Sequence, residues 1–447
     1  MKMNLKSAIC FLMVLLIVSL IGCDKNSVSR PDTEKETVEL SVKIKNDPVI
    51  IYTKEKNPDF SSSGHSKLSP WTENAPIIYK TNTGKNRAYI VNDKTICFDI
   101  LSGKTVLDDN YFDTLSGKLS VWPSNVSYSE KRYLMPEEIG KADLWRAVYY
   151  TAFSVWSDDT TTYSINHGEN KNSMITASGK QYFYKNTVKP ADTQYDNDDY
   201  SGDFGDGYKD VWDNYFAFVC SSASSNEDVT KSGNLMKEDY GPIVWPDNGY
   251  LDEWGESVTT GPRHPCAIVY EDHIYVYYSI DKTIRVVRAP VSGGAKPGTF
   301  KKYFNGGFDE PALPNDFNKD DRSFVYKISG MSSPIIESDN PIQFSVAHLK
   351  DTEYFVGILE ETDKDGHFIS ISVSKDLVNW SKPQELPDTR CKSWDEGNFH
   401  YPKIYSRDFS NSMEVSADGF FVSGTSSNHG GWLLPQYLPL AIEIEEK

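Results

Sequence analysis

The chain has 447 residues and a formal net charge of −18. So acidic a protein repels nucleic-acid phosphates and anionic lipid headgroups, which excludes a nucleic-acid partner and fits a neutral or cationic ligand. Aromatic residues make up 13% of the chain, and turn-forming Gly, Pro, Asn, Asp and Ser interrupt it at short intervals. This composition predicts an all-β sandwich or propeller, and the length is enough for a large core.

The first residues have the pattern of an export signal. Two lysines within the first six residues precede an apolar run from Ala8 to Ile21, which is too short to span a membrane with its flanks. The end of this run, Leu-Ile-Gly followed by Cys23, resembles the lipobox of bacterial lipoproteins. The resemblance implies that residues 1–22 are a signal peptide and that acyl chains on Cys23 anchor the protein to the cell envelope, on its periplasmic or surface face. An ordinary signal peptide with a nearby cysteine is the alternative.

The remaining chain divides into a tether and one domain. Residues 23–37 are mostly polar and charged and have no apolar periodicity, which is typical of a flexible tether. We expect a single domain over residues 38–447. Its first strands are predicted at Val38–Ile44, where apolar and polar residues alternate, and at Pro48–Tyr52. One of these two strands is expected to join the last blade and close a ring.

A short motif recurs along the domain: one or two polar residues, then proline, then an apolar run. Proline at the start of a strand costs no ladder hydrogen bond, so this position has a physical reason. The spacing fits five units of roughly 70 to 95 residues and predicts a five-bladed β-propeller, with one missing copy near residues 164–170. Chance is the alternative, because proline often precedes an apolar strand. The four copies contain Pro76, Pro265, Pro334 and Pro402.

Cysteines and acidic residues give weak signals for metals. Apart from Cys23, the domain cysteines Cys97, Cys220, Cys266 and Cys391 form no CxxC pair, so we favour free buried thiols over a zinc site or two disulfides. Eight aspartates lie between residues 189 and 213, and carboxylates at short spacing suit calcium. The spacing does not match an EF-hand, so a solvated loop is preferred. We expect no cofactor, with calcium left open.

The segment Ser-Val-Ser-Lys-Asp-Leu-Val-Asn-Trp-Ser-Lys-Pro, residues 372–383, resembles a blade hairpin of the five-bladed propeller glycosidases, the arabinanase, β-xylosidase and invertase group. A similar turn occurs in six-bladed sialidase-like propellers. The resemblance implies an active site at the ring centre, where the innermost strands begin. It also implies three carboxylates from three blades: a general acid, a base or nucleophile, and one that raises the pKa of the acid.

Two positions depart from that family's pattern. Its base is commonly an Asp directly before Pro, whereas this chain has Ala75-Pro76 with Glu73 nearby, and Asp47-Pro48 lies before the first unit. Its acid is commonly a Glu before Pro or Gly-Pro, whereas this chain has His264-Pro265. These departures favour a propeller that binds glycan or protein without catalysis. A cluster of His, Arg and Glu at the blade mouths favours an enzyme instead.

Glu169 and Glu396 are the predicted catalytic carboxylates, and Glu73 is the third. Glu169 follows a glycine and lies close to a histidine and a lysine, where charged neighbours set its protonation. Tryptophans in loops would stack on sugar rings. The predicted substrate-binding residues are Asn166, His167, Arg263, His264, His400, Trp71 and Trp254.

Two hypotheses follow. In the first, the protein is a monomeric, lipid-anchored glycoside hydrolase that acts on a neutral glycan. In the second, it is a non-catalytic propeller of the same build that binds glycan or protein. A six-bladed sialidase-like fold ranks below both, because the arginines do not recur at an equivalent position of each unit. No nucleotide-binding glycine loop and no HExxH motif is present in the sequence.

Overall fold

The computed structural model describes residues 39–52, 77–81, 83–91, 95–99, 148–170, 174–175, 181–182, 216–227, 229, 238–247, 261–318, 327–336, 338, 340–392, 399–426 and 434–446. Residues 40–447 form one compact unit, and residues 1–39 form a separate one. None of the helical segments within these ranges has the length and apolarity that spanning a bilayer requires.

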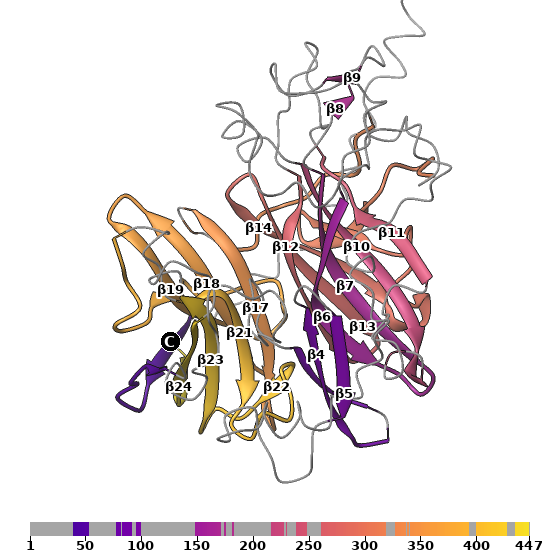
Figure 1. Cartoon of the computed structure of the whole chain (residues 1–447). Coiled ribbons are helices and arrows are strands. Elements are labelled where there is room, and N and C mark those ends of the chain that lie inside the picture. Colours follow the sequence, from indigo (N-terminus) through magenta and orange to yellow (C-terminus); the bar gives the residue numbers. More distant parts are fainter. Residues whose placement is uncertain are drawn as a thin grey trace, which may run out of the picture. The chain divides into compact units, whose positions relative to one another are not determined.

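Four sheets of four or five strands form a propeller-like arrangement of blades, which confirms the prediction of an all-β fold (Figure 1). We name each blade by its first strand. The β6 blade contains β6 (Val148–Ser157), β7 (Thr161–Asn170), β10 (Phe216–Ser225) and β11 (Glu238–Val244). The β12 blade contains β12 (Arg263–Tyr270), β13 (His273–Ile280), β14 (Thr283–Pro290), β15 (Lys301–Phe304) and β16 (Gly307–Pro311).

The other two blades use strands from distant parts of the chain. The β17 blade contains β17 (Pro341–Leu349), β18 (Phe355–Asp363), β19 (Gly366–Ser374), β20 (Gln384–Glu385) and β22 (Glu414–Val415), and β22 lies parallel to β17. The β21 blade contains β21 (His400–Ser406), β23 (Phe420–Ser426), β24 (Leu434–Leu440) and β2 (Ile51–Tyr52). Because β2 pairs with β24, the prediction that an N-terminal strand joins the last blade is confirmed.

Three smaller sheets complete the described structure. The strands β1 (Leu40–Ile44) and β25 (Ile442–Glu446) form one pair, and β8 (Met174–Ile175) and β9 (Gln181–Tyr182) form another. A three-stranded sheet consists of β3 (Ile77–Lys80), β4 (Asn86–Val91) and β5 (Thr95–Asp99). Residues 100–147, which follow it, lie outside the described ranges, and a fifth blade is not confirmed.

The first strands of the four blades lie next to each other in turn: β6 contacts β12, β12 contacts β17, and β17 contacts β21. Strand β3 of the three-stranded sheet also contacts β6. Two strand positions predicted from the sequence are wrong. The first strand of the β17 blade begins at Pro341, whereas the motif at Pro334 leads only into a single bridge between Ile336 and Ile284. Residues 164–170, predicted as a blade mouth, belong to the second strand β7.

The hairpin with the family resemblance folds as its turn chemistry dictates. Asp376 Oδ1 accepts hydrogen bonds from the N–H groups of Val378 and Asn379, at 3.0 and 2.7 Å, and so holds the turn. Trp380 then packs edge-to-face on Phe344, with ring centroids 4.8 Å apart. A Cβ on Gly357 would come within 2.3 Å of the Phe344 ring, so this packing needs a glycine there.

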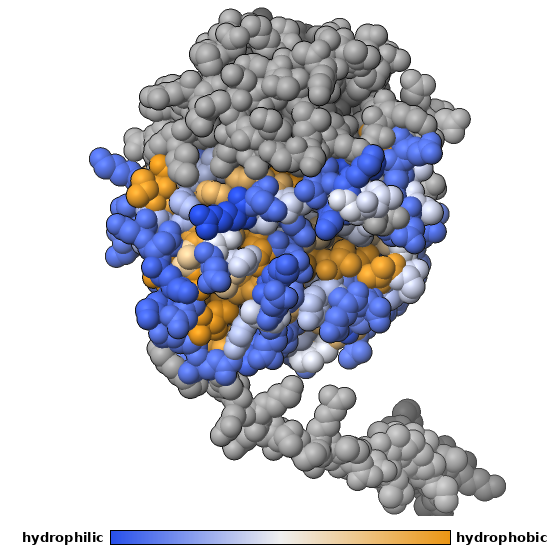
Figure 2. Space-filling view, turned by 90° about the horizontal axis from the view of Figure 1, so that it is seen from below, coloured by the Kyte–Doolittle hydropathy of each residue, from blue (hydrophilic) through white to orange (hydrophobic). Residues whose placement is uncertain are grey.

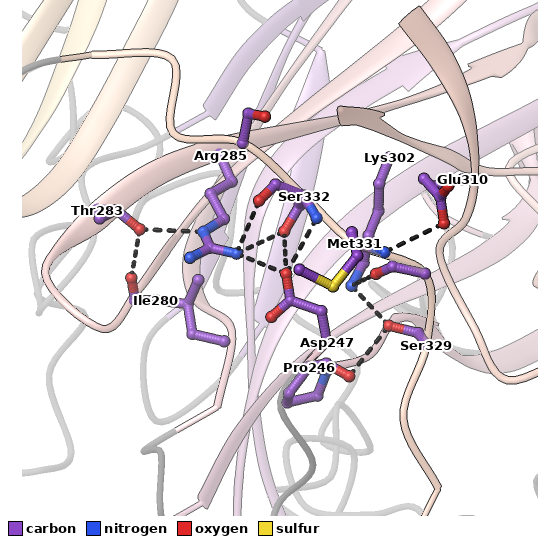
Figure 3. Close-up of polar contacts among 12 residues, drawn as sticks. Pro246, Asp247, Ile280, Thr283, Arg285, Lys302, Glu310, Ser329, Met331 and Ser332 are labelled. Carbon is purple, nitrogen blue, oxygen red and sulfur yellow. Dashed lines mark hydrogen bonds and ion pairs between the residues drawn. The ribbon is translucent and has the colours of Figure 1, made fainter. Parts of the chain in front are cut away.

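Figure 3 shows a polar network between the β6 and β12 blades. Arg285 of β14 forms an ion pair with Asp247 at 2.8 Å and donates to the Ser332 hydroxyl at 2.6 Å. Asp247, which follows β11, also accepts the backbone N–H of Ser332 at 3.0 Å. Lys302 of β15 is 1% exposed and donates to Ser329 Oγ at 2.5 Å. The network satisfies buried charges that would otherwise be costly.

The surface seen in Figure 2 is mainly hydrophilic, with separate apolar patches between polar side chains. Over the described residues, the exposed large apolar side chains are Val49, Val291, Ile328 and Met331. Cys220 and Cys266 are buried free thiols, and Cys391 is a partly exposed one. The apolar core lies within and between the blades.

Candidate functional site

The first strands of all four blades contain a β-bulge or similar irregularity, near the N-terminal end of β12, β17 and β21 and in the middle of β6. A bulge places two residues opposite one and redirects a side chain, and bulges are common beside functional sites. Here each bulge breaks the regular pairing with the second strand of the same blade. The breaks lie between Ala152 and Ser154 in β6, Arg263 and Cys266 in β12, Pro341 and Gln343 in β17, and His400 and Lys403 in β21.

Residues inside these bulges meet at one place. The ring of His264 lies 6.0 Å from that of Phe153 and 5.6 Å from that of Tyr401, measured between centroids. Nδ1 of His264 lies 3.0 Å from the carbonyl oxygen of Ile342. The backbones of His264 and Tyr401 have φ values of 48° and 54°, a left-handed conformation that costs energy in non-glycine residues.

His167 of β7 completes this group, and we call Phe153, His167, His264 and Tyr401 the central ring. Nδ1 of His167 accepts a hydrogen bond from the backbone N–H of His264 at 3.2 Å, and the two imidazoles are 5.1 Å apart. The neighbouring Asn166 faces into its own blade, where its amide donates to Ser222 Oγ at 2.9 Å. Of these two predicted residues, only His167 therefore reaches the centre.

His264 is an uncharged imidazole with a defined tautomer. Burial, with His167 and Arg263 nearby, lowers the pKa of His264 to about 3. A carbonyl oxygen only accepts hydrogen bonds, so the neutral ring carries its proton on Nδ1 and donates it to Ile342. Nε2 of His264 is therefore a hydrogen-bond acceptor.

A cavity of about 20 Å³ adjoins the central ring, enough for about one water molecule. Residues of β3, β6, β12, β17 and β21 line it. Lys403 Nζ donates to the Phe153 carbonyl oxygen at 2.5 Å and lies 4.9 Å from the Phe153 ring centroid. Burial lowers the pKa of Lys403 to about 8, so the ammonium beside this cavity is still mostly protonated at neutral pH.

Glu360 of β18 is a carboxylate that hydrogen-bonds to a residue of the central ring. Its Oε2 accepts the backbone N–H of Tyr401 at 2.9 Å, and its Oε1 contacts His367 Nε2 at 3.0 Å and His400 Nδ1 at 2.9 Å. Burial alone would raise the pKa of Glu360, but the hydrogen bonds from both histidines outweigh it and hold the pKa below its ordinary range. Glu360 is fully buried and charged, so it supports Tyr401 and does not donate a proton to a ligand.

The structure gathers some predicted site residues and separates others. His167 and His264 meet in the central ring, and Arg263 begins the same strand as His264. His400 is fully buried, with its Nδ1 2.9 Å from Oε1 of Glu360, and its role in binding substrate stays a prediction. The backbone of Glu169 lies in β7, and Glu73, Glu396, Trp71, Trp254 and Cys23 lie outside the described residues.

Five residues at or beside the central ring were not predicted from the sequence: Phe153, Tyr401, Lys403, Glu360 and His367. Tyr401 and Lys403 flank Pro402 of the recurring motif, so their proximity to a predicted mouth was available as a signal. Glu360 and His367 lie on either side of a hairpin turn, in strands that pair with each other. No local pattern shows that this hairpin meets His400 of the next blade.

No protein-family model matches the chain, and no curated protein sequence matches it. Solved structures that resemble it include a protein of Bacteroides ovatus described as a hydrolase, with 12% identity, 90% of this chain and 93% of that chain covered, and a TM-score of 0.44. An alpha-L-arabinofuranosidase of Podospora anserina in complex with cellotriose has 9% identity, 85% and 93% covered, and a TM-score of 0.38.

A β-1,2-mannobiose phosphorylase of Listeria innocua has 12% identity to the chain, with 64% and 70% covered and a TM-score of 0.34. Likenesses at such scores carry no argument about activity.

Proposed function

We propose that the protein binds a neutral glycan over the central ring. The observation that supports this most directly is the uncharged His264, whose Nε2 is an acceptor set among the rings of Phe153 and Tyr401. Sugars offer hydroxyl donors and apolar C–H faces and carry no charge, so this combination suits them. The net charge of −18 likewise disfavours an anionic ligand.

Hydrolysis of the glycan is the second candidate, and the place of residue 169 favours it. Glu169 lies two positions after His167 in β7, where its backbone pairs with Tyr149 of β6 and Ala217 of β10. In this proposal Glu169 and Glu396 are the acid and the base or nucleophile, with Glu73 as the third carboxylate. If these carboxylates do not catalyse hydrolysis, the protein only binds the glycan.

We also propose that the sheet of β3, β4 and β5 belongs to a fifth blade. Ile77 of β3 lines the same small cavity as residues of β6, β12, β17 and β21, which are first strands of their blades. A first strand in this position is what a fifth blade requires. The lipobox resemblance supports a further proposal, that Cys23 anchors this propeller to the envelope membrane.

Binding is tested with the soluble chain from residue 24 onward on a glycan array, followed by calorimetry on any hit. His264→Ala is expected to weaken binding about tenfold, because one hydrogen bond to the ligand is lost. His273→Ala is the matched control, since His273 begins β13 at the far end of the β12–β13 hairpin. A variant His264→Ala that binds as well as His273→Ala would overturn the proposal, as would an array without any hit.

Hydrolysis is tested separately on the same hits by product analysis. Glu169→Gln or Glu396→Gln is expected to reduce turnover by roughly 10² to 10⁴ while the affinity for the glycan changes little. Binding without turnover in the wild type would leave the recognition function standing and reject the hydrolase.

A further inference from the structure

Glu360, His367 and His400 bring three metal-binding atoms together in the interior of the protein. Oε1 of Glu360 lies 3.0 Å from Nε2 of His367 and 2.9 Å from Nδ1 of His400, and all three atoms lie within 4.8 Å of one another. All three side chains have 0% exposure. They come from β18, β19 and β21, so the cluster joins the β17 and β21 blades.

Neighbouring groups orient these atoms in the manner of a metal site, where the ligands are themselves hydrogen-bonded. The backbone N–H of Tyr401 donates to Oε2 of Glu360 at 2.9 Å, which turns Oε1 toward the histidines. Sγ of Cys391 lies 3.5 Å from Nδ1 of His367 and donates to the His367 carbonyl oxygen at 3.5 Å, so Nε2 is the atom that faces the carboxylate. The contact between Nε2 and Oε1 therefore needs a cation between them, either a proton or a metal ion.

We propose that Glu360, His367 and His400 bind one divalent transition metal ion of the zinc type. Two imidazoles and one carboxylate are ligands that such ions accept, whereas calcium takes oxygen ligands. Nitrogen and oxygen atoms about 3 Å apart subtend roughly 90° at a metal placed about 2.1 Å from each, so the two contacts between Glu360 and the histidines already suit a shared ion. The two imidazole nitrogens lie within 4.8 Å of each other and would move to about 4 Å or less when both bind the ion. Metal binding releases the proton that His367 shares with Glu360.

This ion is distinct from the calcium that the acidic segment left open, because it uses none of those aspartates. It is also distinct from glycan recognition, since the cluster has no exposed surface in the described structure. Bound metal would stabilise the structure, because one ion would link β18 and β19 to β21, the first strand of the next blade. Loading takes place during folding, before the cluster becomes buried.

The test uses the full chain expressed in cells grown with added zinc or cobalt, followed by chelator treatment of the folded protein and elemental analysis. We expect one equivalent of metal and, for the cobalt form, visible d–d absorption without a thiolate charge-transfer band, because Cys391 contacts His367 rather than the metal. Glu360→Gln, His367→Gln and His400→Gln are expected to lose the metal.

His348→Gln is the matched control, because His348 also faces a carboxylate, with its Nδ1 3.7 Å from Glu414 Oε2, but at the surface. It is expected to retain the full metal content. If the ligand variants fail to fold, Cys391→Ala is the alternative variant, because it removes a group that orients His367. Its metal binding is expected to be roughly 10- to 100-fold weaker. A folded wild type with no more metal than Glu360→Gln, and no cobalt absorption, would show that only protons occupy the cluster.

Discussion

The backbone N–H of His264 donates a hydrogen bond to Nδ1 of His167, 3.2 Å away, across the boundary between two blades. The bond fixes the tautomer of His167, because Nδ1 must be unprotonated to accept it. It also satisfies a backbone donor that the left-handed conformation of His264 removes from the β12 ladder.

Replacing His167 by alanine is expected to destabilise the protein by about 1–3 kcal/mol, because the buried N–H of His264 then lacks an acceptor. The free energy of unfolding in denaturant is the quantity to measure. His273→Ala again serves as the control for removal of an imidazole. Equal stability of the two variants would mean that water replaces the lost acceptor.

Acidification is expected to destabilise the protein through His264. Its pKa is about 3 in the folded chain and 6.5 as a model value, so between these two pH values the unfolded state binds more protons. Stability that is present above pH 6.5 is therefore lost progressively as the pH falls toward 3. Urea unfolding across this range, compared with His264→Gln, measures the effect. The variant is expected to show a shallower pH dependence than the wild type.

Lys302 is expected to give a pH dependence at the alkaline end. Burial lowers its pKa from 10.5 to about 7, so the unfolded state binds more protons between these values and stability rises with pH there. Lys302→Met is expected to remove this rise. The measurement is the unfolding free energy at several pH values in that window. A slope identical in wild type and variant would contradict the assignment to Lys302.

Lipidation of Cys23 is expected to place the protein in the membrane fraction. Cys23→Ser is expected to leave the protein unlabelled by a fatty-acid analogue and to release it from membranes, because no acyl chain is attached. Labelling in cells followed by fractionation checks this. Membrane association that survives the substitution would mean that another part of the chain provides the attachment.

Several features were predictable because they depend on neighbouring residues alone. The hairpin around Asp376 and Trp380 follows from turn chemistry, and the strands near residues 40–52 follow from alternation. The start of the β17 blade was predicted at Pro334, where the proline motif precedes two isoleucines, whereas β17 begins at Pro341 and contains the polar residues Gln343 and Ser345. Both are fully buried and donate to the carbonyl oxygen of Pro402 in the next blade.

The central ring was only half predictable for a similar reason. The alternation rule tells which side of a sheet a residue faces, and a bulge reverses it from that point onward. Phe153 and Tyr401 lie inside such bulges, so the sequence pattern places neither at the centre. His264 was found because it belongs to the recurring proline motif.

The pairing of β2 with β24 also bears on how the protein matures. Ile51 pairs with Tyr437, so the last blade cannot be completed until almost the whole chain has been synthesised. Contacts so distant in sequence make folding slow and leave strand edges unpaired in the meantime. Strand β24, residues 434–440, is therefore needed before the blade that contains β2 can close. Truncation there would leave the N-terminal strand without its partner.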